Sequence, residues 1–243
     1  MTSETKQTEA GTDTETLRRR IDGVRVVLWD FDGPICRLFA RHSAARIADD
    51  LVRWLEGRGL HELLGRPERE SGDPQALLRA FDRARPGDDR VRELEELLTQ
   101  EEIRATGSAL PTPYTDPLIR TWTAVGARQA VATNNSPRAV TGYLAARGLL
   151  PCFAPHIYGR GRQVRHLKPD PHTLESALRA TEVPPSAAVF IGDSAVDHEA
   201  ARRAGVPFLG YARDEDTERE LRNAGADAVV GSFAPLLTLL RQG

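Results

Sequence analysis

The stretch Val-Arg-Val-Val-Leu-Trp-Asp-Phe-Asp-Gly-Pro, residues 24–34, carries the strongest indication of the fold. Residues 26–29 are apolar and rich in β-branched side chains, which is typical of a strand buried on both faces. Two carboxylates, Asp30 and Asp32, follow this run and precede a Gly-Pro turn signal. Positions i and i+2 of a strand project to the same face, so both acids would stand at the carboxyl edge of a parallel sheet. Open α/β folds bind their ligands at this edge.

The closeness of the two acids is itself informative. Like charges at this spacing are costly unless a cation or a shared proton relieves the repulsion. A calcium loop of the EF-hand type is excluded, because Pro34, Ile35 and Cys36 stand where oxygen ligands are required. An ordinary acidic turn is the remaining alternative to a functional site.

Composition limits the classes of protein to consider. The chain has 243 residues, of which 40% are hydrophobic and 28% charged, as in ordinary globular proteins. A net charge of −2 gives no electrostatic basis for binding nucleic acid or an anionic membrane. The sequence shows no secretory signal and no apolar run near the roughly 20 residues that span a bilayer. Two cysteines are too few for a disulfide framework. We therefore expect a cytoplasmic protein, monomeric or homodimeric, without nucleic-acid or membrane partners.

The chain divides into three parts by pattern. Residues 1–20 are expected to form a disordered tail. Residues 37–107 carry helical patterns only, with helices expected at 38–55, 75–84 and 88–105 and a mobile loop at 66–74. Beyond residue 114 helices alternate with strands, which are expected at 128–133, 152–158, 187–191, 206–209 and 228–230.

This alternation is typical of a parallel sheet with helices on both faces. The predicted fold class is therefore α/β, with a Rossmann-like core formed by residues 21–36 and 108–243. An all-helical cap, residues 37–107, would be inserted directly after the first strand. Such a cap above the two acids would exclude water from the site.

Further polar groups follow the predicted core strands. Thr133 ends one strand and precedes Asn134, which suits either a helix cap or an anion site. Lys168 stands before a proline, where a lone lysine is more often a solvated surface residue. Asp193 and Asp197 follow the strand at 187–191, in a turn that equally suits the start of a capped helix.

The order and placement of these groups resemble the haloacid dehalogenase superfamily of phosphotransferases, over about residues 24–240. The helical insertion is similar to the cap of its phosphoglycolate phosphatase-like subfamily. Pro34 and Cys36-Arg37 depart from the residues usual in that subfamily, which affects the substrate assignment and not the catalytic one. The matching motifs, in chain order, are Asp30-Phe31-Asp32-Gly33, Thr133, Lys168-Pro169, and Gly192-Asp193-Ser194 with Asp197.

The resemblance implies a Mg²⁺-dependent phosphatase acting on a small phosphorylated metabolite, phosphoglycolate- or sugar-phosphate-like. Asp30 would be the nucleophile that forms an aspartyl-phosphate, and Asp32 would be the general acid and base. Thr133 and Lys168 would stabilise the transferring phosphoryl group. The remaining implied sets are phosphate binding by Phe31 and Asn134, and metal binding by Asp30, Asp193, the backbone carbonyl of Asp32, and Asp197. Asp197 is alternatively a support for Lys168.

Substrate recognition is less defined by the sequence. Arg37, Arg41 and His42 on the first expected cap helix are candidates, as is Arg160 in a cluster of arginines. A solvated helix face is the alternative for the first three. A phosphomutase using the same residues and a catalytically inactive binding protein of the same fold remain open. Carbon–halogen cleavage is disfavoured, because the family's dehalogenases lack the acid at the position of Asp32.

Overall fold

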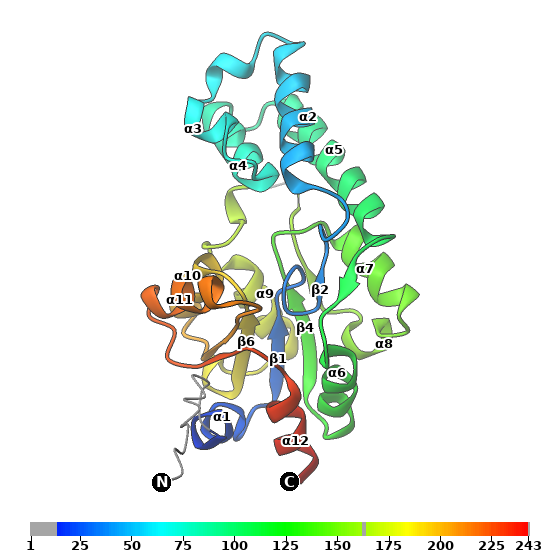
Figure 1. Cartoon of the computed structure of the whole chain (residues 1–243), viewed down its shortest axis with the longest axis vertical. Coiled ribbons are helices and arrows are strands. Elements are labelled where there is room, and N and C mark those ends of the chain that lie inside the picture. The colour runs from blue at the N-terminus through cyan, green and yellow to red at the C-terminus, as the bar shows by residue number, and fades with distance from the viewer. Residues whose placement is uncertain (1–13, 162–163, 243) are drawn as a thin grey trace, which may run out of the picture.

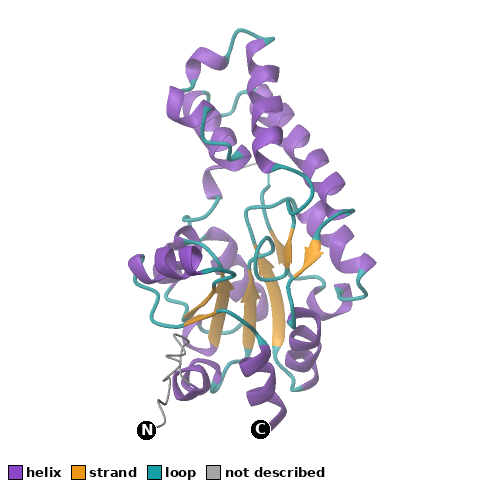
Figure 2. Cartoon of the chain, viewed as in Figure 1, coloured by secondary structure: helices purple, strands orange, loops and turns teal. Residues whose placement is uncertain are grey.

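The computed structural model describes residues 14–161 and 164–242. Its centre is a six-stranded sheet of order β5-β4-β1-β6-β7-β8, in which every neighbouring pair of strands is parallel. Helices lie on both sides of this sheet (Figures 1 and 2), which confirms the predicted α/β class. The strands are β1 (Val26–Trp29), β4 (Arg128–Ala132), β5 (Ile157–Tyr158), β6 (Ala188–Gly192), β7 (Phe208–Tyr211) and β8 (Val229–Val230).

Strand β1 accounts for the unbroken apolar run of the sequence. Its side chains alternate between the two faces of the sheet, and all four are fully buried because both faces are covered. Val27 and Trp29 join the core on the first face, while Val26 and Leu28 join the core on the second. The first face is covered by α1 (Thr14–Ile21), α6 (Thr115–Ala124), α7 (Pro137–Ala146) and α12 (Ala234–Gln242). The second is covered by α9 (His172–Thr181), α10 (Ala195–Ala204) and α11 (Glu215–Asn223).

The insertion after β1 is helical and lies beyond the carboxyl ends of the core strands (Figures 1 and 2). Its helices pack around a separate apolar core that includes Leu51, Leu77, Phe81 and Leu94. The chain enters and leaves it through a two-stranded antiparallel ribbon of β2 (Cys36–Arg37) and β3 (Leu110–Pro111). This arrangement supports the proposed cap at residues 37–107. Its elements are α2 (Ala44–Glu56), η1 (His61–Leu63), α3 (Arg66–Arg69), α4 (Pro74–Ala84) and α5 (Asp89–Thr106).

Several expected boundaries differ from the observed ones. Residues 14–20 are not a disordered tail but belong to α1, because Leu17 is buried against the core; residues 1–13 of the expected tail lie outside the described part. The helix expected at 38–55 begins only at Ala44, since the Ser43 side chain caps it by accepting a hydrogen bond from the Arg46 N–H.

Two further segments contain short helices that the sequence pattern did not separate. The loop expected at 66–74 begins with the single turn of α3, with a proline in its first turn. The strand expected at 152–158 is divided into α8 (Leu150–Phe153) and β5, because Pro155 has no N–H to continue a ladder.

Across the described residues, no helix is both long enough and apolar enough to cross a lipid bilayer.

Candidate active site

Three strand ends build the site. Strand β1 lies between β4 and β6, and Trp29 stands in register with Val131 on one side and Ile191 on the other. The N–H of Asp30 donates to the Ile191 carbonyl at 2.8 Å, so Asp30 leaves the sheet where its neighbours also end. The polar residues that follow the three strands therefore meet at one edge, as the sequence predicted.

The turn after β1 requires glycine. Gly33 adopts a φ of +112°, and a Cβ built there would lie 2.1 Å from Oδ2 of Asp193. The turn is held by hydrogen bonds from its own backbone and from the segment that returns from the insertion. Gly33 N donates to the Cys36 carbonyl at 2.7 Å, and the Thr112 hydroxyl donates to the Gly33 carbonyl at 2.5 Å. Asp193 can therefore approach this turn closely only because residue 33 is a glycine.

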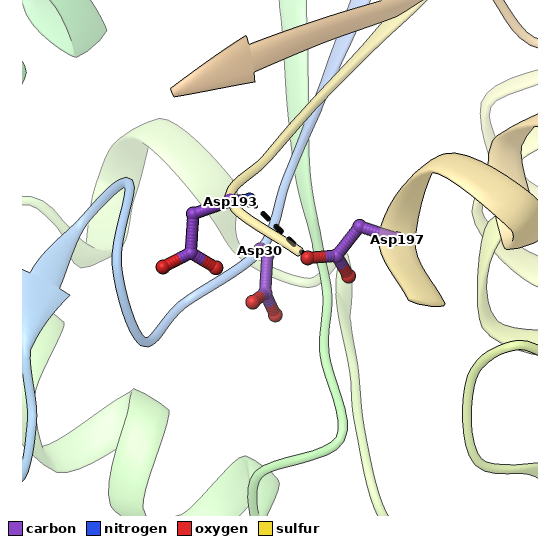
Figure 3. Close-up of side chains that lie close together, drawn as sticks. All are labelled: Asp30, Asp193 and Asp197. Carbon is purple, nitrogen blue, oxygen red and sulfur yellow. Dashed lines mark hydrogen bonds between the residues drawn. The ribbon is translucent and has the colours of Figure 1, made fainter. Parts of the chain in front are cut away.

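Three carboxylates gather at this edge: Asp30, Asp193 and Asp197 (Figure 3). Each offers one oxygen, and these atoms all lie within 4.8 Å of one another. Burial raises the pKa of Asp193 well above its usual value, and the neighbouring Asp197 and Asp30 raise it further. Burial also raises the pKa of Asp30, although Lys168 opposes this. Several hard oxygen donors with excess negative charge are a donor set that suits Mg²⁺.

Asp197 already has partners for both oxygens. Its Oδ2 accepts hydrogen bonds from the Ser194 hydroxyl at 2.6 Å, from the Ser194 N–H at 3.1 Å and from the Asp193 N–H at 3.2 Å. Its Oδ1 accepts from Nζ of Lys168. The reciprocal bonds between Ser194 and Asp197 form a capping box at the start of α10. Asp30 and Asp193 are therefore the carboxylates with fewer hydrogen-bond partners. The contacts of Asp197 favour its supporting role over direct metal ligation.

Lys168 is fully enclosed by its partners. Its Nζ lies 2.7 Å from Oδ1 of Asp30 and also contacts Asp197, and only 2% of the side chain is exposed. Burial alone would lower the pKa of Lys168, but the two carboxylates hold it above its usual value. The lysine is thus a fixed positive charge beside Asp30, which excludes the solvated-surface alternative.

The Lys168 backbone is clamped from two sides. Its N–H donates to Oδ1 of Asn134 at 2.7 Å, and its carbonyl accepts from Nη1 of Arg79 at 3.0 Å and from Nδ2 of Asn134 at 3.3 Å. Arg79 belongs to α4, so a residue of the insertion contacts the backbone of a site residue. The Asn134 side chain therefore positions Lys168. If Asn134 contacts phosphate as predicted, it would do so through its backbone N–H.

Asp32 is not one of the three clustered carboxylates. Its Oδ1 accepts a hydrogen bond from the Leu38 N–H at 2.8 Å. Burial raises its pKa to about 7, against the lowering effect of this hydrogen bond, and Asp30 adds to the rise. A carboxyl group with such a pKa can both give and take a proton near neutral pH. The proposed metal contact of Asp32 involves its backbone carbonyl and stays a prediction.

Thr133 and Phe31 occupy the predicted neighbourhood. The Thr133 hydroxyl is buried and lies within hydrogen-bonding reach of Asp30, where it lowers the pKa of that carboxyl. Its single proton can be donated either to Asp30 or to Oδ1 of Asn135, which lies 3.0 Å away. The Phe31 side chain is buried and packs edge-on against Tyr143, with ring centroids 5.4 Å apart. Any phosphate contact of Phe31 would therefore come from its backbone.

Arg160 does not contact the candidate site in the predicted way. Its guanidinium is buried and donates to Glu102, Glu95, Thr99 and the Asn134 carbonyl, so its donors are used within the protein. The predicted substrate contact of Arg160 is therefore wrong.

The other substrate candidates lie nearer the surface. Arg37 and Arg41 are exposed, and Nε2 of His42 lies 2.9 Å from Oε2 of Glu101. Arg37 belongs to β2, while Arg41 and His42 precede α2 instead of lying on it. Their roles in substrate binding stay predictions.

Glu102 was not singled out from the sequence. Glu102 falls on the buried face of α5, in line with Leu94, Leu98 and Ala105. A charged residue within an apolar stripe signals a buried partner, and this signal was present in the sequence. Ser194 of the fourth motif is the N-cap of α10, in agreement with the capped helix that the sequence suggested for this turn.

The comparisons with known proteins agree with this geometry. A family model described as haloacid dehalogenase-like hydrolase matches residues 24–205. The chain belongs to the haloacid dehalogenase-like hydrolases. It brings residues of the four motifs together at the carboxyl edge of the sheet, where Asp30, Thr133 and Asp193 follow strand ends and Lys168 precedes α9.

Individual relatives extend over nearly the whole chain. A phosphoglycolate phosphatase of Caulobacter vibrioides is 29% identical over 224 residues, which cover 90% of this chain and 87% of the relative. A phosphoglycolate phosphatase of Rhodospirillum rubrum is 28% identical and covers 87% of this chain and 89% of the relative. The solved structure of a D-to-N mutant of CbbY from Rhodobacter sphaeroides, in complex with xylulose-(1,5)bisphosphate, is 26% identical. It matches with a TM-score of 0.63 over 87% of this chain and 95% of that chain.

Proposed function

We propose that the protein is a Mg²⁺-dependent phosphatase that hydrolyses a small phosphorylated metabolite through an aspartyl-phosphate on Asp30. The observation that carries this proposal is the pairing of Asp30 with Lys168 at 2.7 Å, beside Asp193 and at the carboxyl edge of the sheet. A nucleophilic carboxylate, a fixed cation and a second metal-binding carboxylate are what phosphoryl transfer through a covalent intermediate requires.

Asp30 would attack the phosphorus atom of the ester. Burial favours its neutral form, whereas attack needs the anion, and Lys168 together with the Thr133 hydroxyl favours that anion. The oxygen of Asp30 forms a bond to phosphorus as the bond to the leaving alkoxide breaks. Lys168 and Thr133 would then stabilise the negative charge on the phosphoryl oxygens.

Asp32 would transfer the protons. Its pKa of about 7 leaves a substantial protonated fraction near neutral pH, so it can donate a proton to the leaving oxygen. The resulting carboxylate then accepts a proton from the water that attacks the aspartyl-phosphate, which releases inorganic phosphate and restores Asp30. The same residue serves both steps because each step leaves it in the form that the next one needs.

Asp30 and Asp193 would hold the metal ion, with Asp197 fixing Lys168 and the turn around Asp193. When bound, Mg²⁺ supplies charge neutralisation between the anionic nucleophile and the anionic ester. Without a metal ion, the single positive charge of Lys168 does not compensate the negative charge of the three carboxylates. The donor set therefore supports a divalent cation as a working part of the site.

Two substrate classes are supported by the relatives. Proteins similar over most of their length carry the name phosphoglycolate phosphatase, which favours a small phosphorylated acid. The CbbY complex contains a sugar bisphosphate, which makes this the second class to test. Exposed Arg37 and Arg41 beside the entry to the insertion are suitable for a second anionic group.

The testing experiment is phosphate release from 2-phosphoglycolate and a panel of sugar phosphates, with Mg²⁺ and with EDTA. Wild type is compared with Asp30→Asn and with Asp227→Asn, a carboxylate that pairs with Arg20 away from the site. We expect Mg²⁺-dependent release that only Asp30→Asn abolishes. Isomerised product without free phosphate would establish the mutase alternative, and no turnover at all would support an inactive binding protein.

The same proposal includes a cytoplasmic location and a monomeric or homodimeric state. Cys36 is buried as a free thiol and Cys152 is also unpaired, which suits a reducing compartment. Light scattering of the purified chain measures the oligomeric state directly.

A further inference from the structure

A buried ion pair lies beside the site and has no part in the chemistry described above. Glu102 of α5 and Arg160, which follows β5, form a bidentate pair in which Nη1–Oε1 and Nη2–Oε2 are both 2.8 Å. Neither side chain is exposed to solvent. Burying two charges is costly unless their remaining hydrogen-bonding groups are satisfied, so the other partners of the pair indicate its purpose.

Those other partners belong to the turn that follows β4. Oε1 of Glu102 accepts from Nδ2 of Asn135 at 3.0 Å, and its Oε2 accepts from the Ser136 N–H at 2.8 Å. Nη1 of Arg160 donates to the Asn134 carbonyl at 3.0 Å. Three consecutive residues of the turn are thus bound to the ion pair.

The pair also determines how the turn presents Thr133. A carboxylate can only accept hydrogen bonds, so Glu102 requires the NH₂ group of Asn135 to face it. The Asn135 carbonyl oxygen is then directed to the Thr133 hydroxyl, at 3.0 Å, while the Asn135 N–H donates to the same hydroxyl at 3.2 Å. The position of the Thr133 oxygen is therefore linked to the charge of Glu102 through one amide group, and its single proton can turn from Asn135 to a phosphoryl oxygen.

We propose that Glu102 is a positioning residue for phosphoryl transfer: held by Arg160, it fixes the turn at residues 133–136 so that Thr133 meets the phosphoryl group. This inference rests on the proposed function. Glu95 and Thr99, on the same helix, also bind Arg160, each at 3.1 Å. The last helix of the insertion is therefore attached directly to the phosphate side of the site.

The test compares Glu102→Gln with Glu96→Gln. Glu96 lies on the same helix and pairs with Arg138 in an exposed position, so its substitution is the matched control. The measurements are kcat and KM for the best ester of the panel, and the Kd for inorganic phosphate in the presence of Mg²⁺. We expect Glu102→Gln to lower kcat about 100-fold, as for a misplacement of roughly 1 Å, and to weaken phosphate binding. Glu96→Gln should leave all three values unchanged.

Loss of folding is separated from loss of positioning by a second variant. Glu102→Met combined with Arg160→Met removes both buried charges together, and such replacements are often neutral for stability. We expect this double variant to fold, with an unfolding temperature lowered because the turn loses its hydrogen-bond partners, and still to show the reduced kcat. A folded double variant with wild-type kcat would overturn the positioning role.

A double-mutant cycle shows whether Glu102 acts through Thr133. Adding Glu102→Gln to Thr133→Ala should cause little further loss of kcat, because both changes remove the same contact. Fully multiplicative losses would contradict the inference while leaving the proposed function intact. Absence of phosphate release by the wild type itself would instead refute the proposed function.

Discussion

The substitution Gly33→Ala adds a single methyl group and tests how closely Asp193 of the three clustered carboxylates approaches the turn after β1. Gly33 is the residue of the turn after β1 that faces Asp193, and its φ of +112° is unfavourable for any residue with a Cβ. The added Cβ would lie 2.1 Å from Oδ2 and 2.3 Å from Cγ of Asp193, whereas ordinary contact begins at 3.4 Å. Either the turn or the Asp193 carboxylate must move by about 1 Å, which separates Asp193 from Asp30.

Two effects of different size follow from this displacement. Backbone strain at such a φ costs about 1–3 kcal/mol of folding free energy. Misplacement of a metal-binding carboxylate by about 1 Å lowers kcat/KM about 100-fold. The first effect is general to glycines of positive φ, and the second is specific to this position. Gly126→Ala is the matched control, because Gly126 has a φ of +88° and a Cβ there meets no atom within 4 Å.

The assay combines Mg²⁺-dependent phosphate release with thermal unfolding, measured with Mg²⁺ and with EDTA. Both variants should unfold at lower temperature than wild type, by about 2–4 °C for each kcal/mol lost. Only Gly33→Ala should lose activity and the stabilisation that Mg²⁺ provides. Wild-type activity and an unchanged Mg²⁺ response in Gly33→Ala would refute the close approach of Asp193 to this turn.

Three other outcomes follow from the contacts of the site. Lys168→Met leaves the buried Asp30 and Asp197 without their cation, and unfolding in urea without metal should show a loss of about 3–5 kcal/mol; a loss below about 1 kcal/mol, the usual size for an exposed pair, would contradict the buried pairing. Because the Asp32 pKa is raised to about 7, its proton is present below that pH and absent above it, so kcat/KM should fall as pH rises through about 7. A pH profile in which this descending limb persists in Asp32→Asn would assign it to another group. Saturating Mg²⁺ should stabilise wild type by about 2.7 kcal/mol at 100 times its Kd, and calorimetry should find this gain absent in Asp193→Asn but present in Asp227→Asn.

Features that depend on local pattern could be predicted from the sequence. Strand β1 and the acids that follow it were recognisable, because a short run of β-branched and apolar residues that ends at a turn is typical of a strand covered on both faces. Thr133, Lys168 and Asp193 were predicted to lie with Asp30. The parallel register of β1 with β4 and β6 accounts for Thr133 and Asp193, whereas Lys168 is held in place by Asn134 and Arg79. For residues that directly follow a strand, the backbone register of the sheet determines their place, whatever contacts their side chains make.

Features that depend on distant partners could not be predicted in the same way. Arg160 was predicted to be a substrate contact within a cluster of arginines, whereas its actual partner Glu102 lies 58 residues away on another element. Asp197 was given two alternative roles because nothing local indicates that Lys168, 29 residues away, would occupy the oxygen that the Ser194 cap leaves free. The start of α2 depends on the Ser43 cap. The apolar periodicity does not reveal this start, because it also suits residues 38–43.

The most direct test of the central claim is detection of the covalent intermediate on Asp30. Enzyme turning over its best phosphate ester with Mg²⁺ is quenched in acid, and its peptides are analysed by mass spectrometry. The account predicts one phosphoryl group on the peptide that contains Asp30, and none when EDTA is present or in Asp30→Asn. Steady phosphate release by an enzyme that never carries phosphate on Asp30, and that persists in Asp30→Asn, would contradict it.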